Sequence, residues 1–257
     1  MTRILALIAG VGLVVAIACF AGVAAVGGPA LLQHNWNHSW RVHDGTISFG
    51  HDDTNSGDGG GPAETREIAW SGEDGLDLEV PADVQFTQTP GAGKLVITGP
   101  KGTVDALELS GSSLEFRDEP SNAQRVTIVM TAPDVHRFAL DGEGSITIAG
   151  YHQDELDLDL SGSGKLAAAG RARHVKLDIS GDGQADLAKL VSDSADVNIE
   201  GSGHTTIAPA QTANLDISGD GEIDMISHPA NVHSDVSGSG RIVQGSGAAA
   251  EPTSPPR

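Results

Sequence analysis

Acidic side chains recur in this 257-residue chain at a spacing that could build a cation site. We call this row the acidic ladder; with one asparagine, it lies at positions 18–20 residues apart: Asp159, Asp178, Asn198, Asp216 and Asp235. If the copies stack about 4.8 Å apart, neighbouring carboxylates repel by about 0.9 kcal/mol even in bulk water. Ca²⁺ would offset that repulsion, because it prefers oxygen ligands. We favour a solvated acidic face instead, since Asn198 interrupts the row.

Other residues with chemical potential do not converge on one site. Residues 162–165 are similar to part of a phosphate-binding loop, but Asp159 stands where that loop needs glycine and Leu166 where it needs Ser or Thr. The basic cluster at residues 171–174 fits a solvated turn. Five histidines fall at different offsets within the repeat: His152, His174, His204, His228 and His233. We therefore predict no catalytic, cofactor-binding or metal-binding residues, and the question of Ca²⁺ on the ladder stays open.

The elements that would position the ladder are set by six Gly-x-Gly pairs. Their first glycines lie 18–20 residues apart, a period typical of a solenoid. The pairs are Gly142/Gly144, Gly162/Gly164, Gly181/Gly183, Gly201/Gly203, Gly219/Gly221 and Gly238/Gly240. None precedes a predicted helix, which argues against a dinucleotide site. The nonapeptide calcium-binding roll does not fit either, because its period is about nine residues.

Alternating aliphatic residues flank each glycine pair. Two positions before the first glycine the chain has Leu140, Leu160, Ile179, Ile199, Ile217 and Val236. Two positions after the second glycine it has Ile146, Leu166, Ala185, Thr205, Ile223 and Ile242. A period of two predicts strands with every other side chain inward. Each unit is therefore a strand, a Gly-x-Gly corner, a second strand and a looser return, stacked into parallel sheets.

The region before the clear repeats is predicted to be all-β as well. Residues 76–80, 94–97 and 126–130 alternate in part as half-buried strands do. Residues 109–114 look like a degenerate version of the repeat corner. We find no convincing amphipathic helix in this region, so the solenoid is expected to occupy the whole of residues 66–245.

Charge and the N-terminal segment predict an exported protein that does not bind nucleic acid. The chain has 35 acidic and 15 basic residues, a balance that opposes contacts with phosphates or anionic lipids. Residues 1–32 are apolar after Arg3 and predict a helix that acts as a signal anchor or signal peptide. Residues 33–65 are expected to be a juxtamembrane segment and flexible linker, and residues 246–257 a disordered tail.

The motif D-[LIV]-S-G-[SD]-G occurs at residues 159–164, 178–183 and 216–221. It resembles the repeat of the bacterial auto-transporter adhesin head GIN domain family, and the resemblance covers roughly residues 66–245. The resemblance implies an all-β fold, a single-stranded right-handed parallel β-helix with about 18–20 residues per rung. It brings no catalytic residues with it.

These features predict a non-enzymatic exported protein of the bacterial envelope that presents an acidic solenoid surface for adhesion or for protein or polymer binding. It would be membrane-anchored, or periplasmic or extracellular after export. Expected partners are an envelope protein or cell-surface polymer, the membrane through the N-terminal helix, and copies of the chain itself. Two alternatives are a polysaccharide-acting β-helix enzyme and a self-associating scaffold. The enzyme is disfavoured because no aromatic residue follows Tyr151 to stack on sugar.

Overall fold

The computed structural model describes residues 40–43, 46–49, 62–118 and 120–245, and the chain divides into units at residues 1–58 and 59–257. In the first unit, β1 (Trp40–His43) pairs antiparallel with β2 (Thr46–Phe49). The predicted N-terminal helix and the predicted tail lie outside the described residues. Within the described ranges, no helix is long and apolar enough to cross a membrane.

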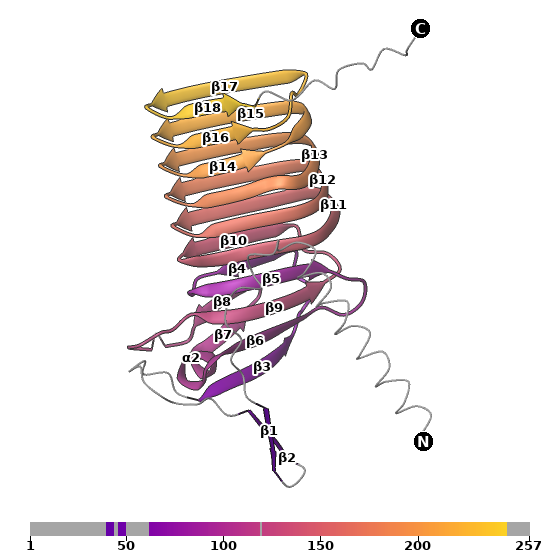
Figure 1. Cartoon of the computed structure of the whole chain (residues 1–257), viewed down its shortest axis with the longest axis vertical. Coiled ribbons are helices and arrows are strands. Elements are labelled where there is room, and N and C mark those ends of the chain that lie inside the picture. The colour runs from indigo at the N-terminus through magenta and orange to yellow at the C-terminus, as the bar shows by residue number, and fades with distance from the viewer. Residues whose placement is uncertain (1–39, 44–45, 50–61, 119, 246–257) are drawn as a thin grey trace. The chain divides into compact units, whose positions relative to one another are not determined.

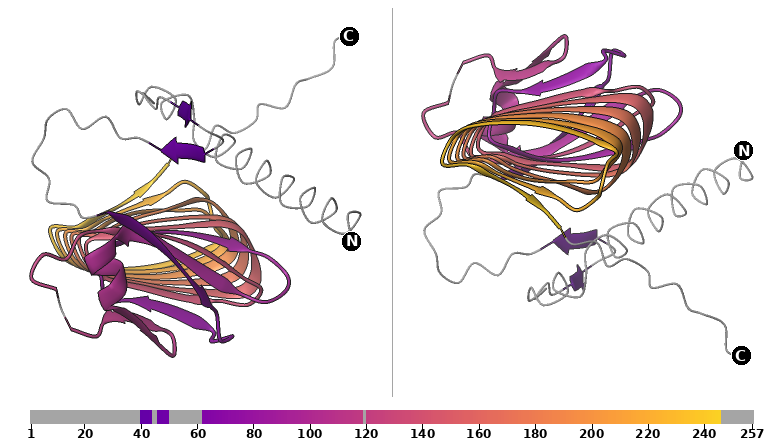
Figure 2. Two further views of the ribbon diagram at one scale, coloured as in Figure 1. Left: turned by 90° about the horizontal axis from the view of Figure 1, so that it is seen from below. Right: turned by 90° about the horizontal axis from the view of Figure 1, so that it is seen from above.

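The second unit is an all-β parallel solenoid of about 5 turns (Figure 1). Seen along the solenoid axis, its successive rungs lie over one another as flattened coils (Figure 2). The strands of the rungs are β10 (Arg137–Gly142), β11 (Gly144–Gly162), β12 (Lys165–Gly181), β13 (Gln184–Gly201), β14 (His204–Ile207), β15 (Pro209–Gly219), β16 (Glu222–Met225), β17 (Asn231–Gly238) and β18 (Arg241–Gln244).

The strand register follows the spacing of the glycines. Gly162 pairs with Gly142 below it and with Gly181 above it, and the series continues through Gly201 to Gly219 and Gly238. The expected looser return is wrong for the middle rungs, because β11, β12 and β13 run through it as strands of 19, 17 and 18 residues. Local register shifts and two glycines with positive φ, Gly150 and Gly170, mark the bend.

The inward columns form the hydrophobic core. Leu158, Leu177 and Ile199 are fully buried on three successive rungs. Thr205 is the polar member of its column, and its hydroxyl donates a 3.1 Å hydrogen bond to the carbonyl of Ala185 in the rung below. That bond satisfies a hydroxyl that would otherwise be costly to bury. Each rung thus covers the apolar residues of its neighbour, as a stacked repeat requires.

The corners require glycine for two different reasons. Gly201 has a φ of +122°, and a Cβ there would lie 2.6 Å from the carbonyl oxygen of Gly181 in the rung below. The second glycine of that corner, Gly203, is needed for packing, because its Cβ would lie 2.7 Å from Cγ2 of Ile179. The first glycine of this pair therefore permits both the turn and the close approach of the rung below, and the second permits packing against an inward side chain of that stack.

The N-terminal end departs from the predicted solenoid. Its elements are β3 (Ala63–Ala69), β4 (Gly75–Leu78), β5 (Ala82–Gln88), β6 (Lys94–Pro100), α2 (Lys101–Ala106), β7 (Leu107–Ser110), β8 (Ser113–Phe116) and β9 (Val126–Ala132). β4 and β5 pair in parallel with the first rung, whereas β6 pairs antiparallel with both β3 and β9. We call β3, β6, β9 and α2 the N-terminal cap.

Two local predictions for this region are wrong. We expected no helix, but α2 lies here and buries Thr103 and Val104. We expected a degenerate solenoid corner at residues 109–114, but β7 and β8 form an antiparallel hairpin there, with Gly111 at a φ of +62°. A glycine with positive φ serves a hairpin turn as well as a solenoid corner, so the residue type alone did not distinguish them.

Candidate functional site

The solenoid presents two outward faces that carry polar residues. The ladder face consists of the outward side chains just before the corners. They lie on β10, β15 and β17 and on the last parts of β11, β12 and β13, at residues 155–161, 174–180 and 194–200. The second face consists of the outward side chains just after the corners, from residues 145–147 on β11 to residues 222–224 on β16. Strand alternation separates both sets from the core, because neighbouring side chains point to opposite sides of a strand.

The acidic ladder is stacked in register, as the sequence predicts. Asp159 pairs with Asp178, Asp178 with Asn198, and the row continues to Asp216 and Asp235. Burial raises the pKa of Asp159 above its usual range, and the neighbouring Asp178 carboxylate raises it further. The repulsion inferred from the sequence is therefore present at this rung.

Local partners offset part of the charge of the ladder face. Lys176 hydrogen-bonds Asp178 and lies 3.8 Å from Asp157, and the bond to Asp178 raises the pKa of the lysine. Asp196 accepts a bond from Asn214 and lies 3.2 Å from the imidazole of His174. These contacts fit a solvated, partly paired acidic face.

The other candidates from the sequence occupy structural positions. Arg173 donates two hydrogen bonds, of 2.7 and 2.6 Å, to the carboxylate of Asp154 in the rung below. Arg171 lies 4.0 Å from Asp193. Residues 162–165 form the corner between two strands, β11 and β12, so no helix N-terminus is present there to bind phosphate.

A shallow, open depression of about 380 Å³ lies on the second face. It crosses four neighbouring parallel strands, β11 to β14, and its lining is mostly short or polar: Ser145, Ile146, Thr147, Lys165, Leu166, Ala167, Gln184, Ala185, Asp186, His204 and Thr206. Ala167 lies between Thr147 and Asp186 in its outward row, so a small side chain contributes to the hollow. We call this the depression.

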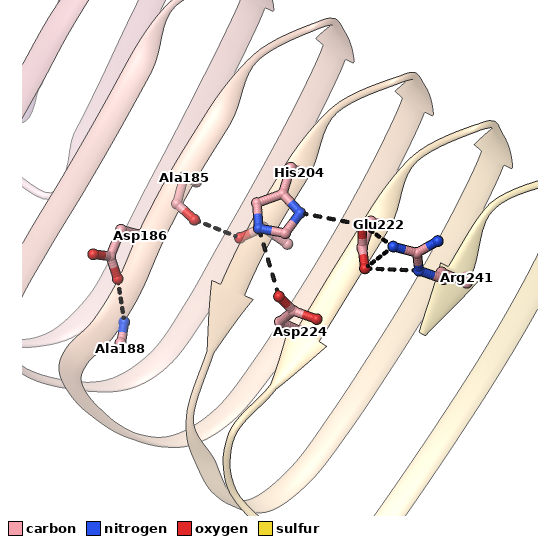
Figure 3. Close-up of polar contacts among 8 residues, drawn as sticks. Ala185, Asp186, Ala188, His204, Glu222, Asp224 and Arg241 are labelled. Carbon is pink, nitrogen blue, oxygen red and sulfur yellow. Dashed lines mark hydrogen bonds and ion pairs between the residues drawn. The ribbon is translucent and has the colours of Figure 1, made fainter. Parts of the chain in front are cut away.

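His204 lies at the end of the depression and contacts two carboxylates of the next rung (Figure 3). Its Nδ1 is 3.8 Å from Glu222 Oε2, and its Nε2 is 3.6 Å from Asp224 Oδ2. Glu222 is directly opposite His204 in the β14–β16 register, whereas Asp224 is two residues further along. All three side chains are partly buried, and one ligand atom from each lies within 4.8 Å of the others.

Arg241 fixes the far side of this cluster (Figure 3). Its Nε and Nη2 donate hydrogen bonds of 2.7 and 2.8 Å to the two oxygens of Glu222. Such a two-point contact orients a carboxylate as well as neutralising it. Glu222 is thereby held between a guanidinium on β18 and an imidazole on β14.

Residues 72–229 match the family described as "Putative auto-transporter adhesin, head GIN domain". The chain belongs to this family. The resemblance inferred from the repeat motif is thus confirmed. No curated protein matches this GIN-domain chain.

This GIN domain is similar to several solved structures. A protein from Bacteroides fragilis described as a putative adhesin is 19% identical, with a TM-score of 0.58 over 71% of this chain and 97% of that one. A putative adhesin from Parabacteroides merdae is 16% identical, with a TM-score of 0.44 over 72% of this chain and 96% of that one. At these identities, the first match supports the solenoid fold and nothing finer.

Sequence reasoning missed the three-residue cluster of this GIN domain. The sequence pointed to the acidic ladder as a possible cation row, and His204 was counted among histidines that fall at different offsets within the repeat. The cluster instead combines His204 and Glu222, which lie opposite each other on neighbouring rungs, with Asp224, which is two residues further along the strand. A search for His and carboxylates across two outward columns of adjacent rungs would have found it. The remaining histidines predicted to be scattered do not join His204 in this cluster.

Proposed function

We propose that the protein is a non-enzymatic component of the bacterial envelope that binds a hydroxyl-rich, neutral polymer along the depression. Export is proposed from the predicted signal anchor or signal peptide at residues 1–32, which would leave the solenoid outside the cytoplasm. The structure from Bacteroides fragilis, which is described as a putative adhesin, supports a role at the cell surface.

The observation that carries the proposal is the shape and lining of the depression. It extends across four strands, and Thr147, Lys165 and Gln184 add hydroxyl, ammonium and amide groups to a lining whose exposed surface is mostly apolar. Groups of this kind hydrogen-bond to sugar hydroxyls, and an open trough admits an extended chain. With a net charge of −20, the protein repels polyanions, so a neutral polymer is the expected ligand.

An enzymatic function receives less support from this geometry. Glycoside hydrolases need two carboxyl groups flanking the scissile bond, one of them with a raised pKa. Among the described carboxyl groups, the one with a raised pKa is Asp159, and it lies on the ladder face rather than in the depression. The depression itself contains a single carboxylate, Asp186.

The test is binding of the purified full chain to a panel of neutral and anionic glycans, with reducing ends measured in parallel. We expect binding to a neutral glycan without release of reducing ends. Replacing both Lys165 and Gln184 by alanine should weaken that binding about tenfold, since two hydrogen-bonding groups are lost.

Lys189→Ala is the matched control, because Lys189 is an exposed lysine outside the depression, on β13, the strand that carries Gln184. It should leave the affinity unchanged. Equal losses in the Lys189 and Lys165/Gln184 variants would show that binding is diffuse and overturn the depression as the site. Release of reducing ends would replace the binding function with an enzymatic one.

A further inference from the structure

We propose that His204, Glu222 and Asp224 form a binding site for a first-row divalent cation, with Zn²⁺ the best match. The three donors are one imidazole nitrogen and two carboxylates, a set that Zn²⁺ accepts together with a fourth, exchangeable ligand. Ca²⁺ fits less well, because it prefers oxygen donors alone. The site differs from the acidic ladder in residues, face and donor chemistry.

The distances require only small side-chain movements. Asp224 Oδ2 lies 3.6 Å from His204 Nε2, and a ligand atom of Glu222 is within 4.8 Å of both partners. A tetrahedral ion with bonds of about 2 Å holds its ligand atoms about 3.3 Å apart. Glu222 Oε2 is nearest the other ring nitrogen, at 3.8 Å from Nδ1, so closing the site takes movements of about 1 Å together with a turn of the imidazole that brings one ring nitrogen to both carboxylates.

Arg241 sets the strength of the site. Its hydrogen bonds orient Glu222 toward the imidazole, which is the role that an outer partner plays for a metal-binding carboxylate. Its positive charge also opposes an incoming cation. Removal of that charge should tighten binding about tenfold, because the guanidinium and the cation would share one carboxylate and like charges repel even in a largely aqueous environment. A purely structural salt bridge would give no such gain.

The experiment is a Zn²⁺ titration of the full chain by calorimetry, with Co²⁺ absorption to detect nitrogen ligation. The chain has ten histidines, several outside the solenoid, so the number of bound equivalents is compared between variants. His204→Gln and Asp224→Asn should each remove one equivalent. Arg241→Gln should still bind that equivalent of Zn²⁺, with an affinity about tenfold higher.

His174→Gln is the matched control. His174 also faces outward and contacts a carboxylate, Asp196 at 3.2 Å, but its other ring nitrogen meets the Ser194 hydroxyl at 2.8 Å. The His174→Gln variant should bind as many Zn²⁺ equivalents as the natural chain. The proposal is overturned if His204→Gln and Asp224→Asn, with unfolding midpoints like that of the natural chain, lose no equivalent, or if His174→Gln loses the same one.

A separate observation concerns the last rung. Val232 and Val236 on β17 are 46% and 40% exposed, although they continue columns in which Ala213 and Ile217 of β15 are buried. In the described part of the chain, β17 pairs only with β15, so its outer edge offers free backbone donors and acceptors (Figure 1). Such an edge is a template for another strand.

The residues of β17 favour an antiparallel copy of the same strand. In the register centred on Ser234, Val232 of one copy lies opposite Val236 of the other. His233 lies opposite Asp235, and symmetry repeats each pair. A register centred on Asp235 would oppose two carboxylates, and cross-strand like charges are destabilising. We infer that two copies associate end to end through β17 in the Ser234-centred register.

Charge substitutions at His233 test this dimer and its register. The full chain in detergent is analysed by sedimentation equilibrium over a range of concentrations, and we expect a monomer–dimer equilibrium. His233→Lys places an ammonium opposite Asp235 and should lower the dimer dissociation constant. His233→Asp places two carboxylates opposite each other at both symmetry-related positions, so it should raise the dissociation constant about tenfold.

Two results would overturn the dimer. One is a dissociation constant that is the same for the natural chain and both His233 variants, which would place any self-association elsewhere. The other is a monomer that dimerises only after residues 246–257 are deleted, which would show that the chain's own C-terminal segment occupies the edge of β17.

Discussion

Gly201→Ala is expected to destabilise the solenoid by about 3–5 kcal/mol. Two costs combine at this corner. The φ of +122° is unfavourable for any residue with a Cβ, and that Cβ would lie 2.6 Å from the Gly181 carbonyl oxygen. The carbonyl belongs to the backbone of the neighbouring rung, so it moves only if the rungs separate. The thermal midpoint, followed by circular dichroism, should fall by roughly 10 °C or more.

Substitutions at two other glycines separate the cost of backbone strain from the cost of the steric clash. Gly72 has a φ of +91° with open space around it, so Gly72→Ala tests backbone strain alone and should cost about 1 kcal/mol. Gly102 lies in α2 without positive φ and without a close neighbour, so Gly102→Ala should be neutral or slightly stabilising. If Gly201→Ala proved no worse than Gly72→Ala, close rung spacing would not be what requires glycine at the corners.

Phe138→Ala is expected to cost about 3–5 kcal/mol, because it empties the junction between the first rung and the strands before it. Phe138 is fully buried, and its ring packs edge-on against Phe86, with centroids 4.9 Å apart. Phe86 belongs to β5, which pairs both with β11 of the rungs and with β9 of the N-terminal cap. Urea unfolding followed by fluorescence and circular dichroism measures the loss.

Two further variants test whether the loss of buried volume at Phe138 is the cause. Phe138→Leu keeps most of the volume and should cost about 1–1.5 kcal/mol. Val243→Ala, at an exposed position on β18, should change stability by less than about 0.5 kcal/mol. A Phe138→Ala variant as stable as Val243→Ala would show that the core at this junction is not continuous.

The rungs were predictable because each depends on its neighbours through one short motif. Once the glycines were aligned, the column Leu160, Ile179, Ile199 had to point inward, and the pairing of Asp159 with Asp178 followed. The N-terminal cap was not predictable in the same way. Alternation in residues 94–97 and 126–130 is the same for parallel and antiparallel neighbours, so it did not reveal that β6 reverses direction.

Helix α2 was missed because its sequence does not favour a helix. It has six residues, which include Gly102 and the β-branched Thr103 and Val104. It forms because tertiary packing buries those two branched side chains, and packing of that kind leaves no local pattern. The metal-capable cluster was missed for a related reason, since its members belong to two columns that only rung stacking brings together.

The stacking of each rung on its two neighbours has a mechanical consequence. A rung contacts only the rungs beside it, so tension applied at the end of the stack would remove rungs one at a time rather than unfold the whole stack together. Each released rung of 18–20 residues would extend the chain by about 65 Å. A solenoid of this kind held at both ends would lengthen in steps under load, and each step would dissipate energy while the remaining rungs stay folded.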